Sequence, residues 1–206
     1  MAQARSTGAR PAKKLDSGGK ANVAEQTAGE PKPARRRISR RKAVEQHVRG
    51  YFDALGRRDS GAIAEHWSDD GVADIVPLGV LRGREEIAGL FRDLFAALPD
   101  LETTVTRVVA GEHEAAVEWR MSGHFTGQAF QGVEPTGTRV EWRGIDLIEV
   151  ADGENASVTA YYDGMSFARQ IGLMPTQGSA PERAIKGAFN TATKLRRALA
   201  ARTSGG

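Results

Sequence analysis

Apolar side chains in the first half of the chain recur every three to four residues, the spacing that aligns them on one face of an α-helix. Three segments show this pattern and are predicted to be helices: 44 to about 57, about 60 to 67, and 84–98. Asp59 begins the second helix as its cap, and Pro99 ends the third. A short apolar run before Pro77 predicts one strand, 72–76, between the second and third helices.

Beyond Pro99 the apolar period changes to two, which is typical of strands with one buried face. Four strands are predicted: 101–110, 115–125, 140–150 and 157–162. Turn-forming residues at 111–114 and 151–155 join them as hairpins. Helices early and strands late predict an α+β fold, in which helices cover one face of a curved, mainly antiparallel sheet. Helical signals return at 166–171 and, weakly, over 181–201; this last amphipathic segment packs on the domain, covers a neighbouring subunit or stays loosely helical.

Charge is distributed unevenly along the chain and sharpens the domain assignment. Residues 1–42 contain 12 Lys/Arg against 3 Asp/Glu, residues 176–206 contain 6 against 1, and residues 43–175 contain 11 against 22. The net charge of +3 therefore describes an acidic domain with two basic ends. Three parts are predicted: a disordered basic tail at 1–37, one folded domain at 38–175, and a basic, partly helical extension at 176–206.

Composition excludes several kinds of chemistry. The chain has no Cys, and residues 43–185 contain no Lys, so disulfides, thiolates and Schiff bases are excluded from the domain. Neither a metal-ligand pattern nor a phosphate loop is present, and we expect no metal and no cofactor. No apolar run approaches the roughly 20 residues that span a bilayer, so we expect a cytoplasmic protein without a membrane partner. Nucleic acid is expected to bind only through the basic ends, for example at 35–42.

Short motifs in a fixed order suggest a family. They are Leu98-Pro99-Asp100, Gly123-His124-Phe125-Thr126-Gly127, Gly132-Val133-Glu134-Pro135-Thr136-Gly137, Gly144-Ile145-Asp146, and Tyr162-Asp163 before Phe167-Ala168-Arg169-Gln170-Ile171-Gly172. With the three preceding helices, they resemble the SnoaL-like polyketide cyclases, relatives of nuclear transport factor 2 and ketosteroid isomerase. The resemblance covers roughly 43–175. It implies a cone-shaped fold, cofactor-independent chemistry on a small hydrophobic carbonyl compound, and a homo-oligomer formed through the outer sheet face.

Asp163, at the end of the last strand, matches the catalytic acid/base of the resembled cyclases. A carboxylate in an aromatic pocket loses hydration, so its pKa rises and it can take and return a proton near neutral pH. The alternative is structural, because Asp163 also precedes a short helix and Asp is a common helix cap.

Asp146 is the second candidate, because it shares one face of its strand with apolar residues such as Trp142 and Ile148. A lone acid on such a face is costly unless it is paired or protonated. By resemblance, Asp146 corresponds to the protonated Asp of ketosteroid isomerase and Tyr51 to its Tyr. The base of that isomerase falls near Val76, which cannot take a proton, and Asp74 is only a partial substitute.

The remaining candidates would line a ligand cavity: His124 by its place in the family motif, and Trp119, Trp142 and Phe130 as aromatic walls. A related epoxide hydrolase mechanism would pair Asp146 with Asp163, but its Arg would stand where this chain has Gly144. The leading hypothesis is therefore a cyclase- or isomerase-type enzyme acting on a polyketide- or steroid-like carbonyl compound, in which an Asp acts as acid/base. The alternative is a non-catalytic module that binds a small ligand.

Overall fold

The computed structural model describes residues 34–76 and 78–203. The described part contains five helices and six strands. In chain order these are α1 (Ala34–Gly56), α2 (Ser60–Glu65), β1 (Trp67–Val76), β2 (Gly79–Arg82), α3 (Arg84–Ala97), β3 (Glu102–Ala110), β4 (Glu114–His124), β5 (Arg139–Ala151), β6 (Glu154–Tyr162), α4 (Gly164–Gln170) and α5 (Ala180–Thr203). Most of the predicted basic tail, residues 1–33, lies outside the described residues.

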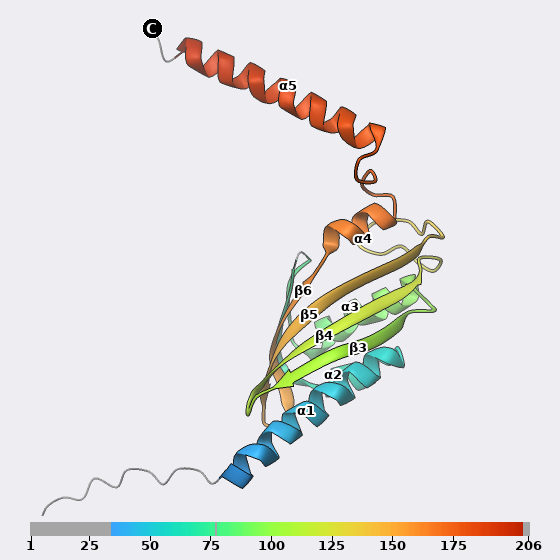
Figure 1. The fold of residues 1–206 in the computed structure, drawn as a ribbon. Coiled ribbons are helices and arrows are strands. Elements are labelled where there is room, and N and C mark those ends of the chain that lie inside the picture. The colour runs from blue at the N-terminus through green and yellow to red at the C-terminus, as the bar shows by residue number, and fades with distance from the viewer. Residues whose placement is uncertain (1–33, 77, 204–206) are drawn as a thin grey trace, which may run out of the picture. The chain divides into compact units, whose positions relative to one another are not determined.

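All six strands form one sheet in the order β2-β1-β6-β5-β4-β3. Neighbouring strands run antiparallel except β1 and β6, which pair in parallel. Figure 1 shows the curvature of the sheet, and residues of α1, α2 and α3 join those of its inner face in one hydrophobic core. The predicted α+β architecture with a curved, mainly antiparallel sheet is confirmed.

The inner face of the sheet follows the predicted alternation most clearly in β5. Val140, Trp142, Asp146 and Ile148 are buried there, Gly144 on the same face is partly buried, and the residues that alternate with them are exposed. The turn after β5 needs only Asp152 and Gly153, both with positive φ, because β6 starts earlier than predicted, at Glu154.

Two features of the sheet were not predicted. β1 begins at Trp67 rather than at residue 72, and its pairing with β6 is irregular between Trp67 and Val72, so the expected alternation of buried residues is interrupted. β2 was missed because it has only four residues and starts at Gly79. A strand this short has too few positions to show a period of two.

A buried polar contact fixes the start of β6 against the first two helices. Asn155 is fully buried, and its Oδ1 lies 2.9 Å from Nε2 of His47 on α1. Its backbone N–H donates to the carbonyl of His66, which follows α2, over 2.8 Å. These contacts satisfy the side-chain oxygen and the backbone N–H of Asn155, though not its Nδ2, and they hold the start of β6 against α1 and the end of α2.

The C-terminal part of the described chain is helical, as the sequence predicted. α4 packs on β5, while the apolar side chains of α5 are largely exposed. No helix in residues 34–76 and 78–203 is long and apolar enough to cross a membrane.

Candidate functional site

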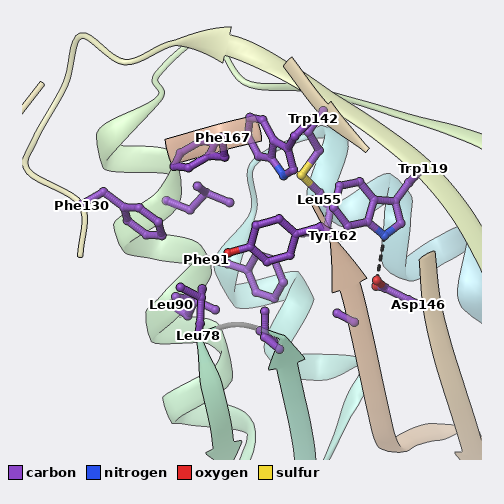
Figure 2. Close-up of a pocket in the computed structure, with 14 residues that line it drawn as sticks. Leu55, Leu78, Leu90, Phe91, Trp119, Phe130, Trp142, Asp146, Tyr162 and Phe167 are labelled. Atoms are coloured by element: carbon purple, nitrogen blue, oxygen red, sulfur yellow. Dashed lines mark hydrogen bonds between the residues drawn. The ribbon is translucent and has the colours of Figure 1, made fainter. Parts of the chain in front are cut away.

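An apolar cavity opens between the inner face of the sheet and helices α1 and α3 (Figure 2). It contains about 630 Å³ of space between atoms, including the part open to solvent. Six aromatic rings, seven aliphatic or Met side chains and one carboxyl group line it: Leu55, Ile75, Leu78, Leu90, Phe91, Leu94, Trp119, Met121, Phe130, Trp142, Asp146, Ala160, Tyr162 and Phe167. A cavity with this lining suits a small apolar ligand that has a few polar atoms.

Asp146 is the one charged residue in this lining and is only 6 % exposed. Its Oδ1 accepts a hydrogen bond of 2.7 Å from the indole Nε1 of Trp119 (Figure 2). Burial raises the pKa of Asp146 to about 7, and the Trp119 hydrogen bond opposes this rise only in part. The group can therefore be either a carboxylate or a carboxylic acid near neutral pH.

Gly144 makes the contact between Trp119 and Asp146 possible. It lies opposite Trp119 in the pairing of β4 with β5, two residues before Asp146. A Cβ atom at Gly144 would lie 2.5 Å from the indole Cζ2 and 2.5 Å from the Tyr161 carbonyl oxygen. The indole ring therefore occupies space that only glycine leaves open.

Tyr162 brings a second polar group into the cavity. Its ring extends from β6 toward Phe91 and α3, with the hydroxyl at the far end (Figure 2). Burial raises the pKa of Tyr162, so its hydroxyl remains a proton donor over the neutral range.

Two segments carry aromatic rings to the cavity from beyond the strands. Phe167 of α4 contacts Trp142 edge to face, with ring centroids 5.2 Å apart. Phe130 lies in a tight turn closed by its backbone pairing with Val133. Gln131 and Gly132 make that turn with positive φ.

Asp163 does not line this cavity. It is exposed and caps α4, where its Oδ1 accepts a 2.8 Å hydrogen bond from the backbone N–H of Ser166. It borders a separate outer depression together with Arg120, Glu141, Trp142, Arg143 and Ser166. The structure thus gives Asp163 the capping contact that was the alternative interpretation of its position, and its catalytic role remains a prediction.

Tyr51 and His124 also lie outside the lining. Tyr51 is buried in the core among aromatic rings, and its pKa is raised first by burial and then by the charge of Asp146. His124 is exposed, and its Nδ1 lies 2.7 Å from Oδ2 of Asp100. That contact closes the end of β4, with the His124 backbone N–H donating to the same carboxylate. Trp119, Trp142 and Phe130 line the cavity, and their role in binding a ligand stays a prediction.

The geometry does not support the epoxide hydrolase mechanism or the ketosteroid isomerase mechanism considered above. Asp146 and Asp163 border different hollows, and the Trp119 indole fills the space beside Gly144 where the epoxide hydrolase Arg would extend. For the isomerase mechanism, the position expected for the base, Val76, is exposed on the outer face of β1. Its neighbour Ile75 faces the cavity instead, and it cannot take a proton either.

Sequence reasoning missed Tyr162, Phe91, Phe167 and the Trp119–Asp146 hydrogen bond. Tyr162 had a usable signal, because it stands two residues after buried Ala160 on the same face of β6. The hydrogen bond had none, since it depends on the register between β4 and β5.

Comparison with known proteins identifies the family. The family model for the SnoaL-like polyketide cyclase matches residues 45–171, and the curated proteins give no match. Among solved structures, a candidate SnoaL-like polyketide cyclase from Jannaschia sp. CCS1 has a TM-score of 0.60 at 21% identity, covering 71% of this chain and 100% of its own. AclR, a candidate hydroxylase from Streptomyces galilaeus, has a TM-score of 0.59 at 21% identity over 77% and 98%.

IdmH, a candidate polyketide cyclase from Streptomyces antibioticus, has a TM-score of 0.55 at 24% identity, covering 62% of this chain and 97% of its own. At these identities the structural matches show a shared fold, the one that the sequence motifs predicted. The family model shows more, because it covers well over half of the chain. The chain belongs to the SnoaL-like polyketide cyclase family.

Proposed function

We propose that this protein is a cofactor-independent enzyme that uses Asp146 as acid/base on an apolar carbonyl compound of the polyketide type. The observation that carries the proposal is the position of Asp146. It is a buried carboxyl group with a pKa near 7, set in an otherwise uncharged aromatic cavity. A general acid/base is most effective when its pKa lies near the working pH.

The proposed reaction begins with removal of a proton from the carbon next to a carbonyl group. The Asp146 carboxylate takes that proton, and the electron pair of the C–H bond moves onto the carbonyl oxygen to form an enolate. The hydroxyl of Tyr162, a donor in the cavity lining, would hold this oxygen. The indole N–H of Trp119 donates a hydrogen bond to Oδ1 of Asp146. In the proposed reaction, Oδ2 of Asp146 is therefore the atom that accepts and returns the proton.

Ring closure follows in the proposed scheme. The enolate carbon attacks a second carbonyl carbon of the same molecule, forming one carbon–carbon bond and an alkoxide. Protonated Asp146 then returns its proton to the alkoxide, so atoms and charge balance without a co-reactant. The aromatic walls would hold the chain folded and exclude water from the enolate.

Exchange of hydrogen for deuterium in a bicyclic ketone tests the proton-transfer step without knowledge of the natural substrate. β-Tetralone in D2O, followed by proton NMR, should exchange its α-hydrogens at a rate that rises with pH and levels off above about pH 7, where Asp146 is a carboxylate. Asp146→Asn should lower this rate by at least about a hundredfold. Asp163→Asn is the matched control and should keep it, because Asn also caps helices well.

Three results would each contradict the proposal. Equal exchange by wild type and Asp146→Asn would remove Asp146 from the chemistry. Saturable binding of a fluorescent polycyclic phenol without any exchange, unaffected by pH or by Asp146→Asn, would identify a non-catalytic binding module. If Asp163→Asn alone abolished exchange, the acid/base would be Asp163.

A further inference from the structure

The helix α5 has an apolar stripe that nothing in the described chain covers. Ile185, Phe189, Leu195 and Leu199 are between 56 % and 68 % exposed. With Ala192 they fall within an arc of about 120° around the helix. The hydroxyls of Thr191 and Thr193 donate hydrogen bonds within the helix, to the backbone carbonyls of Gly187 and Phe189 respectively. A stripe this exposed indicates a binding surface.

The opposite side of α5 is strongly basic. The helix has six Lys/Arg against the single acid Glu182, and residues 183–203 contain no acid at all. Glu182 itself lies 3.0 Å from Lys186 and 3.5 Å from Arg169, so its charge is balanced at the start of the helix. Four of the six, Arg183, Lys186, Lys194 and Arg197, cluster within about 80° of arc opposite the stripe, whereas Arg196 falls within the arc of the stripe and Arg202 at its edge.

We propose that α5 lies in the surface of an anionic membrane. The apolar stripe would enter the boundary of the acyl chains, and the cations would meet the phosphates at headgroup depth. This geometry selects lipid over a protein partner. A groove in a protein contacts one side of a helix and leaves the cations opposite it in water, whereas headgroups surround a helix that lies among them.

This proposal departs from the expectation of no membrane partner, which rested on the absence of spanning segments. A helix that lies in the interface needs no such segment. The acidic domain, with 22 Asp/Glu against 11 Lys/Arg in residues 43–175, would be repelled by an anionic surface. Binding should therefore depend on the basic ends of the chain, and the proposal assigns the apolar part of that binding to α5.

Co-sedimentation of the full chain with vesicles tests the proposal. Wild type should bind vesicles of phosphatidylcholine mixed with phosphatidylglycerol at least about tenfold more tightly than phosphatidylcholine alone. Phe189→Ser combined with Leu195→Ser should lower that binding about tenfold. Lys194→Gln combined with Arg197→Gln should lower it by a similar factor.

The matched control makes the same chemical change at another exposed apolar site, Ile145→Ser combined with Leu147→Ser on the outer sheet face. It should bind like wild type. Unchanged binding by the Phe189/Leu195 variant would overturn the proposal, because the basic ends alone would then account for adsorption. The proposal would also be overturned if wild type bound both kinds of vesicle equally well, or bound neither. Light scattering in lipid-free solution tests the other occupant, a second copy of the chain. If the Phe189/Leu195 variant broke up an oligomer there while its lipid binding stayed unchanged, the stripe would be a contact between copies.

Discussion

Burying a carboxyl group among apolar side chains favours its neutral form, so the protonation of Asp146 should appear in the free energy of unfolding. The folded-state pKa of about 7 lies above the ordinary value of 3.8. Between these values the folded state holds a proton that the unfolded state has lost. This contribution to stability is therefore complete below about pH 4, decreases up to about pH 7 and is absent above it.

Asp146→Asn should remove this pH dependence, because Asn stays neutral and its side-chain oxygen can still accept the Trp119 hydrogen bond. At pH 8 the variant should be more stable than wild type, by as much as about 4 kcal/mol if the whole shift is realised. Urea unfolding across pH 5–8 measures the difference, with Asp163→Asn as control. An identical pH profile in wild type and Asp146→Asn would mean that the carboxyl group is not held in an apolar environment.

Gly144→Ala tests the position of the Trp119 ring. A methyl group there meets both the indole and the Tyr161 carbonyl, so the variant should lose about 1–3 kcal/mol of stability and part of its exchange activity. Gly187→Ala on α5 is the matched control, since its Cβ meets nothing within 4 Å. It should keep wild-type activity and stability or become slightly more stable. Equal urea midpoints for Gly144→Ala and wild type would show that the indole can move away without loss.

At the scale of elements, α4 links the Asp163 cap to the cavity. The cap fixes the first turn of α4, and one turn later Phe167 packs against Trp142. Loss of the cap should destabilise the helix by about 1 kcal/mol. We therefore expect Asp163→Ala to weaken binding of a polycyclic phenol severalfold, by loosening the wall that Phe167 provides.

Fluorescence titration of the phenol against wild type, Asp163→Ala and Asp163→Asn separates the two roles of this residue. Asn keeps the cap and should preserve affinity and exchange. If exchange is lost equally in the Asn and Ala variants while affinity is kept, Asp163 takes part in the chemistry directly.

Elements with a long, regular apolar period were predictable from the sequence. The alternation in β5 placed Asp146 on the buried face, and the helical stripes located α1, α3 and α5. The local sequence pattern does not determine the direction in which the chain leaves β6. For that reason the position of Asp163 was compatible both with a catalytic residue in the cavity, the favoured interpretation, and with a helix cap. The partner of Asp146 was hidden too, because a cross-strand hydrogen bond depends on register rather than on spacing along the chain.

At the scale of the whole molecule, charge is distributed unevenly along the chain. The acidic domain encloses an apolar cavity with a single carboxyl group, while the basic charge is concentrated near the ends of the chain. The proposed chemistry and the proposed lipid contact therefore belong to different parts of the sequence. Variants of Phe189 and Leu195 should not change exchange of β-tetralone in lipid-free solution.

The parallel pairing of β1 with β6 also sets an order of assembly during synthesis. β6 stands between the β1–β2 hairpin and the β3–β4–β5 meander, so it alone joins the two halves of the sheet. A nascent chain that has emerged only as far as β5 leaves one edge of β1 without its hydrogen-bonded neighbour. Tyr162 and Phe167 come later still. The cavity would therefore close only after nearly the whole domain has left the ribosome, and an incomplete chain would have no pocket in which to trap a reactive compound.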